Sequence, residues 1–441
     1  MTGEPRRLVA LVDGSAFYCA CERIFRPELR GQPVVVLSNN DGCVISRSIE
    51  AKRLGVEMGA PYFQIRDLLA ERGVSVFSSN YALYHDMSSR IEQVLETFSG
   101  AVERYSIDEA FLGLQADPWA PDEPQRLSAT ARAIRQRVWD VTRVPVRVSI
   151  AETKTLAKAA SELARRLPEQ SACLWRHPHR DRWLSSLRVR DVWGVGPRWA
   201  RRLEADGAGT AAELAALADD HIRRRYNVVL LRTALELRGI SCLPLGEAPP
   251  PRQSLVRSRM FGTPLADAAP IGRAIAMHAA AAAARLRQDG LAAEAIEAFV
   301  TTGNRPPRWR GRAATVLPTA TSDTLALVRT ARQLVAPALR GARPGTRFKK
   351  AGVILTGIVP VGQRQADLFR RPTAEQPALM AALDAATRRF GRGAVVVAAQ
   401  GTPDDLRDIH AGGGQTAWGM RRAHLSPRYT TVWDEIPEAR L

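Results

Sequence analysis

A short apolar run near the start of the chain, Leu8 to Val12, ends at an acidic residue, Asp13. An uninterrupted apolar run of this length is typical of a strand that is buried on both faces. Further along, Val102 to Tyr105 and Ala110 to Leu112 read as two strands joined by a tight turn that carries Asp108 and Glu109. The chain therefore needs a sheet covered on both sides, with acids at the ends of its strands.

The order of the other elements predicts an α+β fold with several domains. Helical patterns at 84–98, 127–141 and 154–166 alternate with strands, which gives a ferredoxin-like βαββαβ sheet with residues 29–83 inserted after the first strand and helix. Residues 187–240 are predicted to be helical throughout.

A proline-rich linker, Leu243 to Pro251, separates these elements from a second series of strands and helices. The two helices of that series are predicted at 271–287 and 323–339, and its last strand at 351–358. Residues after Val361 are rich in Gly, Arg and Pro, and we expect them to be loosely packed.

Three carboxylates brought together would repel one another, and a divalent cation would neutralise them. Hard carboxylate oxygens with no His or Cys nearby favour Mg²⁺, which keeps water and substrate phosphates in its shell. Two Mg²⁺ ions about 4 Å apart are a common arrangement for in-line phosphoryl displacement. An Asp–Glu pair is also ordinary turn chemistry on a wet surface, so spacing alone leaves both interpretations open.

The charge of the chain is strongly positive and unevenly spread. There are 63 Lys and Arg against 45 Asp and Glu, a net charge of +18. Residues 250–365 hold 18 basic and five acidic residues, a net charge of +13. Such a surplus indicates nucleic acid, an anionic membrane or a phosphorylated ligand, and its concentration favours a module that binds a nucleic-acid backbone. A basic, Arg-rich proteome is the alternative explanation.

Nothing in the sequence indicates a membrane span, a secretion signal or a zinc site. The longest apolar run, Ala274 to Ala284, is too short to cross a bilayer, and Asp13 interrupts the N-terminal apolar stretch. The five cysteines are odd in number and lack CxxC spacing. These features favour a reduced, cytoplasmic protein.

Several strings occur in order along the chain: Asp13-Gly-Ser-Ala-Phe-Tyr18, Val34 to Gly42, Glu50-Ala-Lys-Arg-Leu-Gly55 and Tyr105-Ser-Ile-Asp-Glu-Ala-Phe111. Together they resemble the palm and fingers of Y-family (lesion-bypass) DNA polymerases. Three further segments resemble the UmuC-like catalytic subunits within this family: Ser38 to Ile45, Phe77 to Tyr81 and Leu425 to Thr431. The resemblance covers nearly the whole chain, and Ser-Ile-Asp-Glu-Ala is its most specific motif.

The resemblance implies a right-hand polymerase with a ferredoxin-like palm, small α/β fingers, a helical thumb with a helix-hairpin-helix and a ferredoxin-like little finger. The implied boundaries are palm 1–28 and 84–172, fingers 29–83, thumb 173–242, linker 243–251, DNA-binding little finger 252–362 and C-terminal tail 363–441. The implied activity is that of a DNA-directed DNA polymerase that performs error-prone translesion synthesis in the SOS response to DNA damage.

The resemblance also assigns the metal ligands. Asp13 and Asp108 would bridge two Mg²⁺ ions, and Glu109 would complete the shell of the catalytic ion. The backbone carbonyl of Gly14 would hold the nucleotide-bound ion.

Nucleotide contacts follow from the same resemblance. Tyr18 corresponds to the steric gate that excludes the ribose 2′-hydroxyl, and Phe17 lies beside it. The residues that correspond to triphosphate contacts are Ser46, Lys52 and Arg165. Ile49 stands where many relatives have a tyrosine and cannot donate a hydrogen bond. Lys52 replaces the arginine of some relatives, which weakens a bidentate contact.

Two regions are candidates for holding DNA. Val192 to Gly196, followed by a helix, resembles a helix-hairpin-helix, in which Gly194 and Gly196 let backbone N–H groups approach a phosphate. A GxG sequence also occurs in ordinary turns. Taken singly, each basic side chain of the second module is more often a solvated surface charge than a contact with the DNA backbone. The prediction of DNA binding therefore rests on the excess of basic over acidic residues in this module. The candidates are Arg257, Arg259, Arg308, Arg310, Arg347, Lys349 and Lys350.

The pattern Gln365-Ala-Asp-Leu368-Phe369 follows the basic module. It resembles the peptide by which bacterial polymerases dock on the β sliding clamp, with Leu368 and Phe369 as apolar anchors and Gln365 fixing the register. The alternative is that both anchors pack against the little finger. The other implied partners are primer-template DNA, dNTPs, cleaved UmuD-like subunits and a RecA filament.

Two other functions share parts of this pattern. A non-catalytic accessory protein can keep a polymerase-like scaffold, but such paralogues lose the metal-binding acids, and all three are present here. A nucleotide cyclase can share the ferredoxin-like palm, but it has no use for the thumb-like hairpin or the basic module. Primer extension separates these functions.

Overall fold

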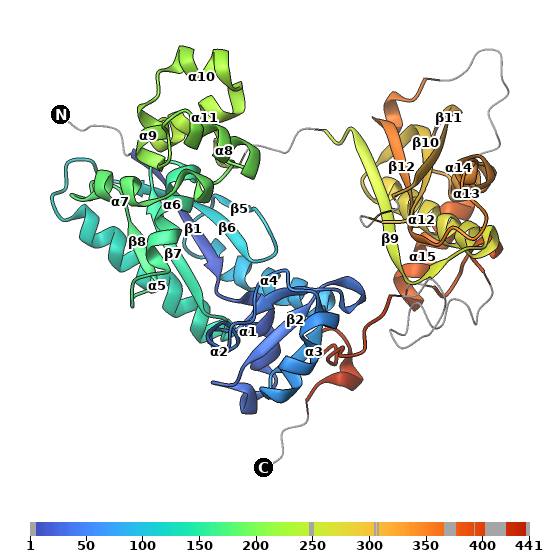
Figure 1. The fold of residues 1–441 in the computed structure, drawn as a ribbon, viewed down its shortest axis with the longest axis horizontal. Coiled ribbons are helices and arrows are strands. Elements are labelled where there is room, and N and C mark those ends of the chain that lie inside the picture. The colour runs from blue at the N-terminus through green and yellow to red at the C-terminus, as the bar shows by residue number, and fades with distance from the viewer. Residues whose placement is uncertain are drawn as a thin grey trace. The chain divides into compact units, whose positions relative to one another are not determined.

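A computed structural model describes residues 6–246, 251–303, 306, 308–365, 376–391, 393–401 and 420–437 (Figure 1). The chain divides into two compact units. The first comprises Met1–Val36, Val44–Ala248 and Ser426–Leu441, and the second comprises Leu37–Cys43 and Pro249–Leu425. Among the described helices, none combines the length and the apolar character that a membrane crossing needs.

The centre of the first unit is a five-stranded sheet in the order β5-β6-β1-β7-β8, which we call the palm sheet. Its strands are β1 (Arg6–Gly14), β5 (Val102–Arg104), β6 (Glu109–Ala116), β7 (Val146–Ala151) and β8 (Ser171–Cys173). β1 pairs antiparallel with both β6 and β7. Leaving aside β8, the first and third strands of this sheet in chain order, β1 and β6, are central, which is the predicted ferredoxin-like order.

Both faces of this sheet are covered by helices. Leu8, Ala10 and Val12 of β1 belong to a core shared with α1 (Phe17–Ile24), α4 (Tyr81–Glu96) and α5 (Glu123–Thr142). Leu11 and Phe111 point the other way and pack with α6 (Lys154–Ala164) and the helices that follow it. Because successive side chains of a strand alternate between faces, burial on both sides requires the uninterrupted apolar run that ends at Asp13.

The residues inserted after α1 form a small sheet in the order β3-β2-β4 with two helices beside it. Its elements are β2 (Val34–Leu37), β3 (Val44–Arg47), α2 (Ile49–Arg53), α3 (Tyr62–Glu71) and β4 (Ser75–Ser78). The Ser48 hydroxyl caps α2 by accepting from the backbone N–H of Ala51.

Residues after β8 are helical, as predicted, and pack on α6. The helices are α7 (Arg180–Ser186), α8 (Pro197–Ala205), α9 (Ala211–Ala216), α10 (Asp219–Arg225) and α11 (Val228–Leu237). A capping box between Thr210 and Glu213 sets the start of α9. Figure 1 shows α8 to α11 gathered at one end of the palm sheet.

The second unit contains a four-stranded sheet in the order β11-β10-β12-β9. Its elements are β9 (Ser254–Leu265), α12 (Ala268–Gln288), β10 (Leu291–Thr301), β11 (Arg310–Thr321), α13 (Thr324–Gln333), α14 (Val335–Leu339) and β12 (Phe348–Pro360). The chain order is again βαββαβ, but here the second and fourth strands are central.

One predicted helix of this unit, at 323–339, is in fact two helices that meet at Leu334. Pro337 has no N–H group and cannot donate to the carbonyl of Gln333, four residues earlier, where α13 ends. The single-helix prediction was therefore wrong at this proline.

The expectation of a loosely packed tail was wrong for several described segments. α15 (Pro377–Phe390) buries Met380 in the second unit, and Asp384 accepts two hydrogen bonds from Arg287 at 2.8 and 2.7 Å. Ser426 and Tyr429 are buried in the first unit. A few buried side chains spaced among polar ones give little periodicity, which is why composition did not reveal this packing.

Candidate active site

The register of the palm sheet carries the three acids to one end of it. Asp13 is the cross-strand partner of Glu109, and the next residue, Gly14, donates its N–H to the carbonyl oxygen of Asp108 at 2.8 Å. The turn between β5 and β6 thus ends beside the last residues of β1. Acids separated by about 95 residues in the sequence become neighbours through strand pairing.

Two of the acids are held by basic side chains. Arg147 donates from Nη2 to Asp13 Oδ2 at 2.6 Å and from Nη1 to the Ser15 hydroxyl at 2.9 Å. Lys158 Nζ donates to Glu109 Oε1 at 2.6 Å. Within the residues described, no three His, Cys, Asp or Glu side chains converge closely enough to hold a metal ion. Arg147 and Lys158 supply the positive charge that the acids need in the protein alone.

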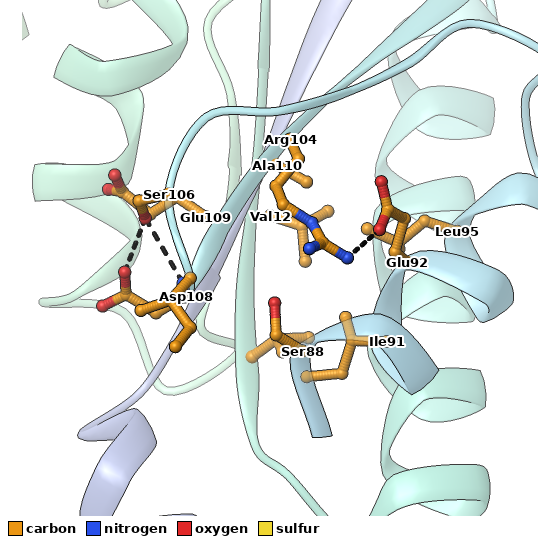
Figure 2. A pocket seen from close by; sticks show the side chains of 12 residues that line it. Val12, Ser88, Ile91, Glu92, Leu95, Arg104, Ser106, Asp108, Glu109 and Ala110 are labelled. Atoms are coloured by element: carbon orange, nitrogen blue, oxygen red, sulfur yellow. Dashed lines mark hydrogen bonds and ion pairs between the residues drawn. The ribbon is translucent and has the colours of Figure 1, made fainter. Parts of the chain in front are cut away.

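The third acid, Asp108, accepts a hydrogen bond at Oδ1 from the Ser106 hydroxyl at 2.6 Å. Figure 2 shows this contact and, in the same small cavity, the ion pair between Arg104 and Glu92. Apolar side chains such as Val12, Ile91 and Leu95 line much of the cavity. Its lining therefore fits packing against α4 better than it fits a substrate.

The carboxyl of Glu109 lies in surroundings that disfavour its negative charge, which a divalent cation would neutralise. Burial raises the pKa of its carboxyl above the usual value, the negative charges of Asp13 and Asp108 add to the rise, and Lys158 opposes it. Hard oxygen donors that repel one another at the end of a sheet are the donor set that Mg²⁺ prefers.

Tyr18 lies on α1, the helix that follows β1, and is half-buried. Its ring stacks on Tyr84 with centroids 4.5 Å apart and an interplanar angle of 16°, and it meets Tyr81 edge-on at 6.1 Å. Burial raises the pKa of the Tyr18 phenol to about 12, and the charge of Asp108 contributes. Phe17 beside it is buried in the palm core.

The predicted triphosphate contacts differ in their surroundings. Ser46 is buried on β3, and its hydroxyl accepts from the N–H of Cys19 on α1 at 3.5 Å. Lys52 is exposed on α2, and Ile49 is 53% exposed. Arg165 caps the C-terminus of α6, where it is exposed and pairs with Glu162 at 3.2 Å. Their roles at a triphosphate stay predictions.

The hairpin before α8 contains the two predicted glycines. Gly194 has a φ of +89°, a left-handed conformation that favours glycine. Gly196 is the N-cap of α8 and Pro197 follows it. In the part of the chain that the structure describes, no side chain accepts a capping hydrogen bond from the N–H groups of this first turn.

The predicted basic contacts of the second unit divide between two faces of its sheet. Phe299 points away from the helix-covered core formed by Ala298 and Val300. Arg310 and Lys350 lie over its ring, 5.3 and 5.8 Å from the centroid. This outer face also carries Arg312, the exposed cross-strand partner of Phe299, which sequence reasoning missed.

Arg257 and Arg259 alternate in phase with Leu255 and therefore face the side of α12. Burial, and then the charges of Arg259, Arg257 and Lys350, lower the pKa of His278 on α12 to about 4. The predicted set is thus not one continuous surface. Arg347 is exposed just before β12, Lys349 is exposed at its start, and Arg308 is exposed just before β11.

Comparisons with known proteins agree with this architecture. Residues 12–162 match the impB/mucB/samB family, and residues 252–368 match the C-terminal domain of that family. The chain is 40% identical to Protein ImpB of Salmonella typhimurium over 98% of this chain and 100% of the relative. It is also 40% identical to Protein UmuC of Salmonella typhimurium, over 97% of this chain and 99% of that protein.

The chain belongs to the impB/mucB/samB family. A Y-family DNA polymerase chimera of known structure superposes with a TM-score of 0.63 at 19% identity, covering 80% of this chain and 99% of that one. DNA polymerase IV of Corynebacterium diphtheriae is 34% identical over 49% of this chain and 47% of its own length. The predicted Y-family fold and UmuC-like resemblance are confirmed.

Residues 377–439 match a domain of unknown function. Of the predicted clamp-binding residues before it, Gln365 is exposed, whereas Leu368 and Phe369 lie outside the described residues.

Sequence reasoning missed two basic residues at the acids. Arg147 is the cross-strand partner of Asp13 on β7, a relation that no local pattern reveals. Lys158 lies one turn after Lys154 on α6, and the basic side of this helix was the only signal for it. Nζ of Lys158 lies 4.5 Å from the ring centroid of Tyr105 and 5.8 Å from that of Trp193. Trp193, in the hairpin before α8, donates from Nε1 to the Tyr105 hydroxyl at 3.1 Å.

Proposed function

We propose that this member of the impB/mucB/samB family is a DNA-directed DNA polymerase that performs error-prone translesion synthesis in the SOS response to DNA damage. The observation that carries the proposal is the pairing of Asp13 with Glu109, with Asp108 hydrogen-bonded through its carbonyl to Gly14. Family membership over nearly the full length supports it.

The three acids and the carbonyl of Gly14 would hold two Mg²⁺ ions. When bound, these ions would lower the pKa of the primer 3′-hydroxyl and neutralise charge on the triphosphate. Arg147 and Lys158 keep Asp13 and Glu109 in place through direct hydrogen bonds. Because these two carboxylates are already fixed in position, they need to move less when a substrate binds. Such preorganisation favours the transition state.

The chain's own residues would select and orient the nucleotide. Tyr18 would form the wall against which the 2′ position of the sugar lies, with Phe17 packed beside it. The residues that would contact the triphosphate are Ser46, Lys52 and Arg165.

DNA would be held by two regions. Gly194 and Gly196 would present N–H groups of the hairpin and of α8 to a backbone phosphate. In the little finger, we assign the outer face to the DNA backbone because Arg310, Arg312 and Lys350 share it. Arg347 and Lys349 extend this basic surface. Arg257 and Arg259 face the side of α12 on the edge strand β9 and would contact DNA apart from that surface.

The proposal extends to partners and location. Primer-template DNA and dNTPs are the substrates. The β sliding clamp, cleaved UmuD-like subunits and a RecA filament are the proposed protein partners, in the cytoplasm.

Primer extension by the purified chain tests the proposed activity. We expect Mg²⁺-dependent addition of the nucleotide that the template specifies, including opposite a damaged base. DNA binding without any addition would favour the accessory protein, and a cyclic nucleotide product would favour the cyclase.

The salt dependence of DNA binding tests the outer face of the little finger. We expect log Kd of the full chain to depend on log salt concentration with a slope of about 5 in magnitude, as for roughly six phosphate contacts. Replacing both Arg310 and Lys350 with Ala is expected to reduce that slope by about 2. Arg285→Ala is the matched control, because Arg285 lies on α12 and pairs with Asp289 at 2.9 Å. Equal slopes for the double variant and the unchanged chain would contradict this assignment.

Replacing Leu368 and Phe369 with Ala tests clamp docking. We expect the double variant to lose stimulation by the clamp and to keep basal extension on short primer-templates, because the anchors would fill a pocket on the clamp. Phe390→Ala is the control, since Phe390 is a 67% exposed aromatic of the tail outside the pattern. Full stimulation of the double variant would refute docking, and a lowered Tm without loss of stimulation would support packing on the little finger.

A further inference from the structure

The segment Ser426–Tyr429, which we call the C-terminal clasp, is anchored on α1 and on the start of α4. Asn80, the N-cap of α4, places Nδ2 at 3.0 Å from Ser426 Oγ and at 3.0 Å from the carbonyl oxygen of Pro427. Tyr429 stacks on Phe25, with ring centroids 4.6 Å apart, and its hydroxyl accepts from Arg26 Nε at 3.2 Å. Both ends of the clasp therefore contact other residues of the first unit.

A buried chain of contacts leads from the clasp to Tyr18. The Ser426 hydroxyl donates to Glu22 Oε1 at 3.0 Å, and the Tyr84 hydroxyl donates to the same oxygen at 2.6 Å. The Tyr84 ring is the one on which Tyr18 stacks at 4.5 Å. Ser426 and Glu22 are 404 residues apart in the sequence, yet one carboxylate oxygen joins them.

Neither water nor another side chain can readily replace these buried hydrogen bonds. Glu22 and Tyr84 are fully buried, and Ser426 is 3% exposed. Among the described residues, Glu22 Oε2 has no hydrogen-bond partner, so Tyr84 and Ser426 hold the carboxyl through Oε1 alone. Burial raises the pKa of Glu22 to about 7, and the two hydroxyl bonds oppose that rise. In a low-dielectric core, loss of one such bond shifts the groups that remain.

We propose that the C-terminal clasp fixes the ring of Tyr18 through Glu22 and Tyr84, and so sharpens the exclusion of ribonucleotides. Ser426, Glu22 and Tyr84 are positioning residues, since only Tyr18 would meet the sugar. This inference rests on the proposed gate role of Tyr18. It also gives the end of the domain of unknown function at 377–439 a task in sugar selection.

Single-nucleotide insertion by the full chain, with kcat and KM measured separately for deoxy- and ribonucleotides, tests the proposal. We expect Ser426→Ala to raise the relative kcat/KM for the ribonucleotide by about 3- to 10-fold, the equivalent of one buried hydrogen bond. The gain should lie in KM for the ribonucleotide, while kcat for the deoxynucleotide stays within about two-fold. Ser426→Thr keeps the hydroxyl and should restore discrimination.

Two further variants keep the test decisive. Tyr84→Phe keeps the stacked ring and removes the bond to Glu22, so it should relax sugar choice in the same direction even if Ser426→Ala folds poorly. Tyr429→Phe removes a hydrogen bond of the clasp that leads to Arg26 rather than to Tyr84, and should leave discrimination unchanged.

Tyr18→Ala separates the inference from the proposed gate. If Tyr18→Ala admits ribonucleotides but Ser426→Ala and Tyr84→Phe do not, the clasp has no part in sugar selection and the gate stands. A Tyr18→Ala variant that still rejects them overturns both. Equal losses for both sugars together with a lowered Tm would show that the clasp only stabilises the fold, and would also overturn the inference.

Discussion

Asp108→Ala is expected to abolish nucleotide insertion while leaving primer-template binding nearly intact. Loss of a carboxylate proposed to bridge two ions would remove several kcal/mol of transition-state stabilisation, which corresponds to a fall of about 1,000-fold or more in the insertion rate. In the proposed function the hairpin before α8 and the little finger hold the DNA, so Kd for primer-template should change by less than about two-fold.

The matched control for Asp108→Ala is Asp86→Ala. Asp86 lies on α4 and pairs with Arg90 at 2.8 Å, so the control makes the same change of charge away from the acids. We expect it to keep normal insertion. Near-normal extension by Asp108→Ala with Mg²⁺ would contradict the proposed role of this acid.

Tyr18→Ala is expected to keep polymerase activity and to admit ribonucleotides, with a rise on the order of 100-fold in their relative kcat/KM, as when a pocket wall is removed. The physical reason is that the Tyr18 ring, backed by Tyr84, would stand against the 2′ position of the sugar. Competition between ribo- and deoxynucleotides during primer extension measures the change.

Tyr18→Phe is the control, because it keeps the ring and its stacking on Tyr84. It should retain discrimination. If Tyr18 is only a core residue, Tyr18→Ala should instead cost a few kcal/mol of unfolding free energy without altering sugar choice. A folded, active Tyr18→Ala variant that rejects ribonucleotides would count against the gate.

Local patterns predicted most of the fold. The run from Leu8 to Val12 must be buried on both faces, and the structure places helices on both. Local patterns placed Asp13 at a strand end and put Asp108 and Glu109 in a turn, but grouping them as metal ligands rested on the family resemblance. Pro337 was also readable from the sequence, but the helical pattern continued past it and hid the break after Gln333.

Features that depend on pairing between distant strands could not be predicted. Arg147 meets Asp13 because β7 lies in register beside β1, and no spacing along the chain encodes that register. The contact of Ser426 with Glu22 on α1 was equally unpredictable, because it joins two segments 404 residues apart that no local pattern relates. The division of the basic residues is different, since the alternation of Arg257 and Arg259 with Leu255 was present in the sequence and placed them on the core side.

The most direct test of the two-metal site is a crystal structure of the chain with primer-template DNA, an incoming nucleotide and Mn²⁺ in place of Mg²⁺, with anomalous scattering locating the ions. We expect two peaks about 4 Å apart, both in contact with Asp13 and Asp108, with Glu109 in contact with one of them. Ions bound only at the nucleotide phosphates, with neither Asp13 nor Asp108 in contact with them, would contradict the account.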